Sequence, residues 1–117
     1  MPTVDEHKKK YNINKKLLTN ELKLDKCTCY DWISVVAFYS ALHLIEGELA
    51  KGGIHSPDHS FRRRTIDMIS NYSNVRRQFK VLYDRSRIAR YGPLVVDKGK
   101  AEHALQCLEQ IEKEITL

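Results

Sequence analysis

The spacing of apolar residues in the first half of the chain predicts two helices. Residues 4–22 form a lysine-rich segment in which apolar side chains recur at helical spacing, at Val4, Tyr11, Leu18 and Leu22. After a connector, a longer helix should end at Gly52 and Gly53, because glycine readily adopts the backbone conformation that stops a helix. At the start of this helix, Thr28 and Asp31 resemble a capping box in which Asp replaces the usual Glu.

The second half of the chain predicts three further helices. Ser56 and Pro57 form a cap and first-turn pair for a helix that runs to about Ser70. The next helix runs from about residue 73 to 91, where Gly92 and Pro93 stop it. Asp97 caps a last helix with an apolar stripe at Ala101, Ala104, Leu105, Leu108, Ile111 and Ile115. The 117 residues therefore predict one domain, an all-α up-and-down bundle of four to five helices.

The second predicted helix is apolar nearly all the way round, which marks it as the centre of the bundle. At about 100° per residue, one of its sides carries Trp32, Val36, Tyr39, His43 and Glu46. A carboxylate on such a side needs a partner. One interpretation places Glu46 at an edge of the bundle and makes His43 a core histidine with its hydrogen bonds satisfied; the other places both in a polar site.

The fourth predicted helix carries three arginines in its last two turns. Its core stripe is expected to consist of Val75, Phe79, Leu82, Ser86 and Ala89. On the same helical wheel Arg85 and Arg90 flank this stripe on opposite sides, whereas Arg87 points outward into solvent. The small side chains of the stripe leave a gap near Tyr91, so the flanking guanidiniums either bind a phosphate there or pair internally with Glu46.

Charge and composition narrow the classes of function. The net charge is +5, but residues 51–100 carry +8 and the two flanks together −3, an asymmetry that favours a polyanionic partner such as nucleic acid. Three cysteines, two of them one residue apart, do not suggest a disulfide framework. No secretory signal or apolar run long enough to span a membrane is apparent. We therefore expect a cytoplasmic protein that does not associate with membranes.

Two segments resemble a known family. AFYSALHLIEGELAKGGIHSPDHSFRRRTI is similar to the conserved helix, glycine turn and Ser-Pro-x-His helix start of the HEPN family, and SRIARYG resembles the end of a later conserved helix. The resemblance covers residues 32–92, roughly half of the chain. It implies a small helical bundle that forms a homodimer with a shared cleft. Many HEPN proteins are metal-independent endoribonucleases of toxin–antitoxin or other defence systems, and others are inactive modules that bind RNA or nucleotides.

The sequence departs from the ribonuclease signature of that family, in which an Arg is followed, after four to six intervening residues, by His. Here Arg85 leads to Tyr91 instead, and tyrosine, with a pKa of about 10, is a poor proton acceptor at neutral pH. If the chain cleaves RNA, the candidate catalytic residues are Arg85, Arg90 and Tyr91, with His59 or His43 as the base. The candidate nucleic-acid-binding residues are Arg63, Arg64, Arg85, Arg87 and Arg90.

Neither a metal ion nor a cofactor is expected. His55 and His59 with Cys27 and Cys29 lack a familiar zinc-ligand spacing, and the chain has no glycine-rich phosphate loop. Three functions remain open. The first is a HEPN-like module that binds nucleic acid or nucleotide, in a toxin–antitoxin or defence-type system with a nucleotidyltransferase-type partner. The others are a metal-independent endoribonuclease with non-standard residues and a structural dimerisation domain without a ligand, so whether the chain is an enzyme is also open.

Overall fold

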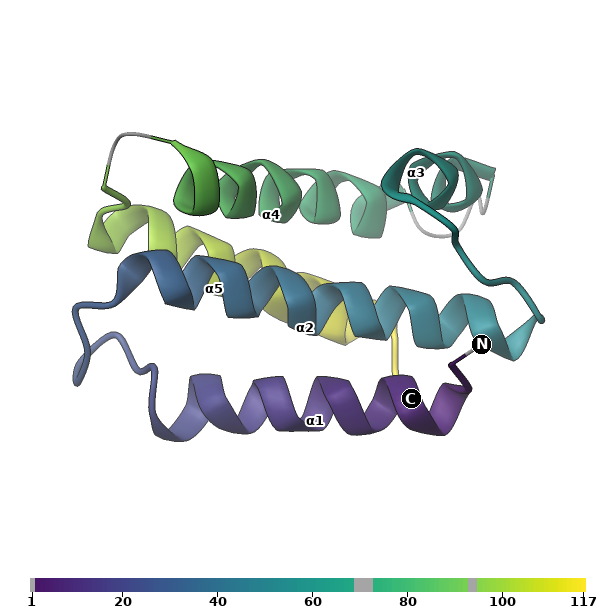
Figure 1. The fold of residues 1–117 in the computed structure, drawn as a ribbon, viewed down its shortest axis with the longest axis horizontal. Coiled ribbons are helices and arrows are strands. Elements are labelled where there is room, and N and C mark those ends of the chain that lie inside the picture. Colours follow the sequence, from purple (N-terminus) through teal and green to yellow (C-terminus); the bar gives the residue numbers. More distant parts are fainter. Residues whose placement is uncertain (1, 69–72, 93–94) are drawn as a thin grey trace.

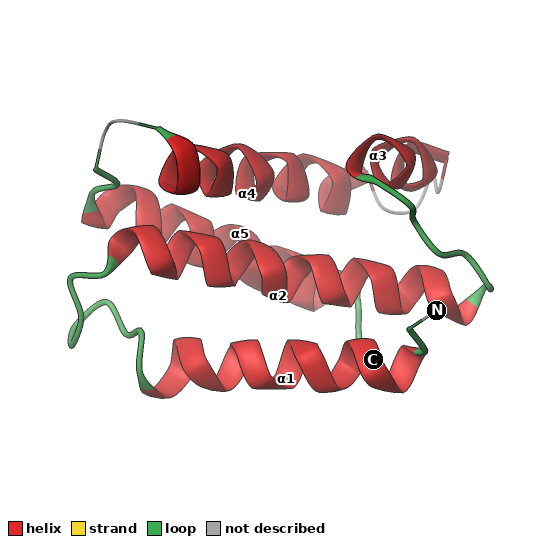
Figure 2. Ribbon diagram, in the orientation of Figure 1, coloured by secondary structure: helices red, strands yellow, loops and turns green. Residues whose placement is uncertain are grey.

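The computed structural model describes residues 2–68, 73–92 and 95–117 and confirms the all-α bundle (Figures 1 and 2). Within these residues the chain forms five helices. They are α1 (Val4–Asn20), α2 (Tyr30–Lys51), α3 (His59–Met68), α4 (Ser73–Tyr91) and α5 (Lys98–Glu114). Each predicted helix is therefore present, although α1 ends two residues before the predicted position and the predicted end of the third helix, Ser70, lies outside the described residues.

The central position of α2 is also confirmed. It packs against α1 on one side and against α4 and α5 on the other, and α5 lies behind it in the view of Figure 1. The short α3 is seen end-on beside the start of α4, close to the last turns of α2. Because α2 and α4 run in opposite directions, the first turn of α2 lies at the same end of the bundle as the last turn of α4.

The core forms where the apolar stripes of α2, α4 and α5 meet. Phe38 is the largest fully buried side chain, and its ring stacks on that of Phe79 with 5.4 Å between the ring centroids. The predicted stripe of α4 is buried as far as Ser86, with Ala89 half-buried at its end. The stripe of α5 is likewise buried, except for the half-buried Leu105.

Two of the predicted helix starts are wrong. Thr28 does not cap α2: Cys29 holds the N-cap position without a side-chain hydrogen bond. The Asp31 carboxylate instead accepts a hydrogen bond of 3.0 Å from the backbone N–H of Val96, because the segment before α5 lies against the start of α2. Nor do Ser56 and Pro57 begin α3, which starts at His59.

An aspartate side chain caps the start of α3, and another caps the start of α5. At the start of α3, the Asp58 carboxylate accepts a hydrogen bond of 2.8 Å from the backbone N–H of Phe61. At the start of α5, Asp97 accepts one of 2.8 Å from the N–H of Lys100, which confirms the predicted cap. Both bonds satisfy backbone N–H groups that have no partner within the first turn of a helix.

By length and composition α2 is a candidate membrane span, contrary to the expectation that no apolar run approaches that length. An 18-residue window of this helix has a mean hydropathy of 1.3, but 72% of the window is buried inside the bundle. Core helices of water-soluble proteins pass the same test, so this single helix is weak evidence for a membrane.

Candidate nucleic-acid interface

Arg90, in the last turn of α4, lies between two tyrosine rings. Its Nη1 donates a hydrogen bond of 3.3 Å to the Tyr39 hydroxyl, and its Nε donates one of 3.3 Å to the backbone oxygen of Ser86. The guanidinium carbon is 6.0 Å from the centroid of the Tyr39 ring and 5.0 Å from that of Tyr91. Within the described part of the chain, no carboxylate forms an ion pair with this exposed guanidinium. Its charge is therefore oriented by aromatic rings and left unneutralised.

Two hollows lie near the last turns of α4, and Arg90 lines the smaller of them. One, of about 240 Å³, is lined by Asp31, Trp32, Val35, Ala89 and Arg90. It borders Ala89 and Arg90, but Ser86 and Tyr91, which were also expected beside the gap, do not line it. The other, of about 460 Å³, is lined by Asp84, Arg87, Ile88, Tyr91 and Gly92. Trp32, which lines the smaller hollow, is 62% exposed, and Tyr91, which lines the larger one, is 76% exposed, so each hollow has a ring surface open to solvent. A flat aromatic ligand with an attached anion would find both stacking surfaces and a cation here.

Arg85 lies apart from the two hollows, whereas Arg87 lines the larger one. Nη2 of Arg85 lies 3.2 Å from Nδ1 of His103 on α5, so Arg85 and Arg90 leave α4 on opposite sides, as the helical wheel predicts. Arg87 is exposed, also as predicted, and its guanidinium lies 5.9 Å from the centroid of the Tyr83 ring. Arg87 and Arg90 therefore share the exposed end of α4, whereas Arg85 faces α5.

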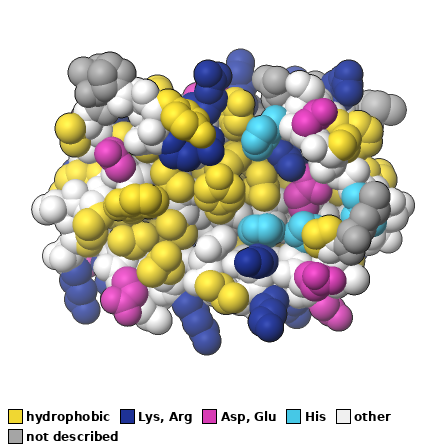
Figure 3. Space-filling model, in the orientation of Figure 1, with side chains coloured by type: hydrophobic (Ala, Val, Ile, Leu, Met, Phe, Trp, Pro, Cys, Tyr) yellow, Lys and Arg dark blue, Asp and Glu magenta, His cyan; other side chains and the backbone are white. Residues whose placement is uncertain are grey.

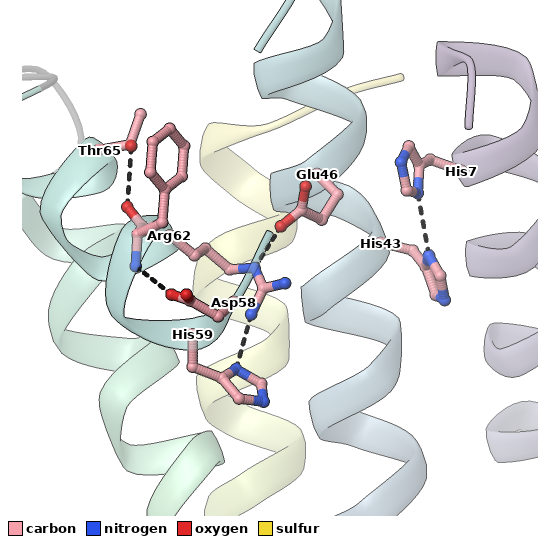
Figure 4. Close-up of polar contacts among 8 residues, drawn as sticks. His7, His43, Glu46, Asp58, His59, Arg62 and Thr65 are labelled. Carbon is pink, nitrogen blue, oxygen red and sulfur yellow. Dashed lines mark hydrogen bonds and ion pairs between the residues drawn. The ribbon is translucent and has the colours of Figure 1, made fainter. Parts of the chain in front are cut away.

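Glu46 is paired with a residue that the sequence did not single out. Arg62, on α3, donates a hydrogen bond from Nε to Oε1 of Glu46, and the two residues are 7% and 6% exposed (Figure 4). The expectation that Arg85 or Arg90 lies near Glu46 is therefore wrong. From Tyr39 to Glu46 is about two helical turns along α2, roughly 10 Å, so the end of α4 lies beside one part of α2 and α3 beside another.

The arginine run at positions 62–64 serves different purposes. Arg62 is buried and Arg64 is exposed, because three consecutive residues of a helix do not share one face. The side chain of Arg63 lies outside the described residues. A signal for the buried member was present in the sequence, since Arg62 lies one turn before Ile66, which is buried in the core.

His59 contacts the same guanidinium. Nη1 of Arg62 lies 2.6 Å from Nδ1 of His59, and because a guanidinium can only donate, Nδ1 must be the acceptor and Nε2 must carry the ring proton. The His59 ring also lies beside Tyr83, with 4.8 Å between the ring centroids. In this tautomer neither ring nitrogen offers a free lone pair, which counts against His59 as a general base.

His43 contacts a second histidine across the α1–α2 interface. Its Nδ1 lies 3.1 Å from Nδ1 of the buried His7, so one nitrogen donates while the other accepts (Figure 4). The helices approach closely here because residue 47 is glycine: a Cβ atom at Gly47 would lie 3.3 Å from Cβ of His7. Burial lowers the pKa of both rings, that of His43 to about 4, with the neighbouring His7 and Lys10 also lowering it. His43 is therefore a neutral packing residue at neutral pH.

The contacts of Arg62 and those of Arg90 both involve side chains of α2, namely Glu46 and Tyr39. In Figure 3, apolar side chains cover the middle of the face on which α2 lies in front, and histidines with a carboxylate gather toward the end where α3 lies. Phe38 lies between the two sets of contacts, because its ring is close to that of Tyr39 and to that of His59. Among the described residues, no group of three or more His, Cys, Asp or Glu side chains is placed to hold a metal ion.

Comparison of the chain with protein-family models, curated protein sequences and solved structures gives no match. The candidate interface therefore rests on its own geometry.

Removing Arg62 should destabilise the fold far more than removing Arg90. The Arg62→Ala change leaves the buried Glu46 carboxylate without its partner and should lower the free energy of unfolding by about 3–5 kcal/mol. The Arg90→Ala change removes an exposed side chain and should cost less than about 1 kcal/mol. Urea unfolding followed by circular dichroism measures both. Equal effects of the two changes would contradict this assignment, and the apolar double variant Arg62→Met/Glu46→Leu should recover most of the lost stability.

Acid should loosen the contact between α1 and α2. A histidine whose pKa is lower in the folded than in the unfolded chain binds fewer protons when folded, so stability falls as the pH drops from 6.5, the unfolded value, toward about 4. The charged groups around the pair include Glu6, Lys10, Glu46, His55 and Arg62. We expect His43→Asn to remove roughly 1–2 kcal/mol of this pH-dependent loss, allowing for partial solvent screening. Chemical unfolding at several pH values tests it; a variant with the wild-type slope would argue against the assignment.

Proposed function

We propose that this protein is a HEPN-like module that binds single-stranded RNA across the end of the bundle where α2 begins and α4 ends. The observation that carries the proposal is the Arg90 guanidinium, which lies against the rings of Tyr39 and Tyr91 and has no carboxylate partner among the described residues. Had Arg90 paired with Glu46, it would have a structural role. Because Arg62 already neutralises Glu46, the stability of the fold does not explain the position of Arg90.

The surroundings of Arg90 suit a nucleotide chain. Arg90 and the exposed Arg87 would bind backbone phosphates, while unpaired bases would stack on the open rings of Trp32 and Tyr91. Asp31, on the wall of the smaller hollow, offers a carboxylate that can accept a hydrogen bond from a base amino group. Bases in a duplex are already stacked and paired, so this arrangement favours single strands.

The contacts favour binding over cleavage. A metal-independent endoribonuclease needs a base near the scissile phosphate, and both histidine candidates are engaged elsewhere: His59 accepts a hydrogen bond at Nδ1 from Arg62, and His43 contacts His7. Both contacts lie toward the α3 end of the face, away from Arg90. The resemblance to HEPN proteins extends the proposal to a toxin–antitoxin or defence-type system with a nucleotidyltransferase-type partner, and such a system predicts an adjacent gene for that partner.

RNA binding should depend on Arg90 and Trp32. We expect Arg90→Ala and Trp32→Ala each to weaken the binding of a single-stranded RNA about tenfold, because they remove a phosphate contact and a stacking surface. Affinity should fall steeply between low and physiological salt, and the salt slope should be smaller for Arg90→Ala. Fluorescence anisotropy with a labelled oligonucleotide in EDTA measures both, and gel analysis of the same samples for 2′,3′-cyclic phosphate ends reports cleavage.

Lys113→Ala serves as the charge-matched control. It removes one exposed cation from the last turn of α5, the opposite end of the bundle from Arg90, and should lower affinity less than Arg90→Ala. Equal losses for the two variants would indicate binding to net charge alone and refute the proposed interface. No binding even at low salt would favour the structural dimerisation domain, and cyclic phosphate ends in EDTA would favour the endoribonuclease.

From the resemblance to HEPN proteins we also propose that the chain forms a homodimer. Exposed apolar side chains outside the proposed stacking surfaces are available for a partner copy; they include Ile13, Leu17 and Val95. Light scattering in moderate salt at micromolar concentration should give twice the mass of the 13.7 kDa chain. A monomeric mass would remove the shared-cleft arrangement while leaving RNA binding by a single copy to the anisotropy measurement.

A further inference from the structure

Cys27 and Cys29 form a contact in the turn that joins α1 to α2. The backbone N–H of Cys29 donates a hydrogen bond of 3.0 Å to Sγ of Cys27, and the N–H of Cys27 donates one of 2.9 Å to the backbone oxygen of Lys23. Cys29 is exposed and Cys27 is partly exposed, so a small solute can reach both sulfurs. The third cysteine, Cys107, is buried on α5.

The two thiols differ in their contacts with the backbone, because Sγ of Cys27 accepts the N–H of Cys29. Cys29 occupies the N-cap position of α2, but its side chain makes no capping hydrogen bond. Instead, a hydrogen bond with Cys27 raises the pKa of Cys29 above its usual value. The two cysteines are therefore close neighbours in the turn, with Sγ of Cys27 accepting the backbone N–H of Cys29. Hydrogen bonds to a sulfur stabilise the negative charge that it carries when it attacks a disulfide.

We propose that Cys27 and Cys29 are a redox-responsive pair that closes to an intramolecular disulfide by exchange with a small-molecule disulfide such as oxidised glutathione. Cys27, as its thiolate, attacks one sulfur of the glutathione disulfide, and the other glutathione leaves as a thiolate. Cys29 loses its proton to solvent and attacks the Cys27 sulfur of the mixed disulfide, which expels the second glutathione. Two protein thiols are oxidised and one glutathione disulfide is reduced to two thiols.

The spacing permits this ring but does not favour it. Residues two apart have Cα atoms at most about 7 Å apart when the chain is extended, and disulfides require roughly 4.4–6.8 Å, so the bond forms in all but the most extended backbone conformations. A ring closed by so short a segment is strained, and strained, exposed disulfides are reduced readily. The pair therefore suits a reversible response to oxidant rather than a permanent cross-link.

The only tryptophan of the chain lies next to the pair and provides a direct readout. Trp32 follows Cys29 by about one helical turn at the start of α2 and is 62% exposed. Closure of the disulfide should quench its fluorescence or alter its surroundings. This readout requires no RNA, so the proposal stands or falls independently of the proposed function.

The test is a titration of the full chain in glutathione buffers, with acid-quenched intact-mass spectrometry beside Trp32 fluorescence. We expect a species lighter by the two thiol hydrogens, a fluorescence change with the same midpoint, and full reversal by dithiothreitol. Cys107→Ser should behave like the wild type. Cys27→Ser and Cys29→Ser should each yield only a glutathione adduct on the remaining thiol of the turn.

Two outcomes would overturn the proposal. One is a wild-type chain that accumulates glutathione on both turn cysteines without losing the two hydrogens. The other is a chain whose turn thiols remain free in the most oxidising buffer while the exposed thiol of the Cys27→Ser variant reacts. Because each variant replaces a thiol by a hydroxyl of similar size outside the core, loss of folding does not complicate the comparison.

Discussion

The buried ion pair between Glu46 on α2 and Arg62 on α3 constrains the rest of this structure. A carboxylate that is only 6% exposed on the central helix must be neutralised or leave the bundle. The chain supplies the cation from α3, a helix of ten residues that is too short to bury much apolar surface. The pair thus fixes α3 on α2 while it resolves the cost of burying Glu46, and removal of either member leaves the other charge uncompensated.

This pairing determines what the arginines at the end of α4 are available to do. The buried carboxylate of Glu46 needs a buried cation, and Arg62 fills that need. Arg90 is therefore held by weaker contacts, a tyrosine hydroxyl and two aromatic faces, that orient its guanidinium without cancelling its charge. A sequence specifies a fold when its local preferences agree with the packing of the whole chain. A charged side chain that the packing does not require is therefore a candidate for a functional role. The two halves of α2 differ in this respect. The charge of Glu46, in the second half, is neutralised by Arg62, whereas Arg90, beside the first half, has no ion-pair partner among the described residues.

Most of the fold could be predicted from the sequence because it depends on local periodicity. Apolar spacing together with glycine and proline stop signals located the five helices, the dominance of α2 and the buried stripe of α4, while Asp97 capped its helix as expected. Two of the failures, at Asp31 and at Glu46, share one cause. Asp31 binds the backbone of Val96, and Glu46 binds Arg62, so each side chain is claimed by a segment from elsewhere in the chain. A helical wheel shows which side of a helix a residue occupies but not which other helix covers that side.

The candidate site shows the same division between local and non-local information. The opposite orientations of Arg85 and Arg90 follow from their positions on one helix, and the sequence predicts them correctly. The roles of the histidines depend on distant partners, because a histidine can act as a base only at a nitrogen that is not already engaged. Arg62 occupies Nδ1 of His59, and His7 occupies Nδ1 of His43 while burial lowers the pKa of that ring. Both histidines therefore support the packing of α2 against its neighbours, and the chemistry that remains open to solvent on this face is that of guanidinium and aromatic rings, which bind anions and bases without transferring protons.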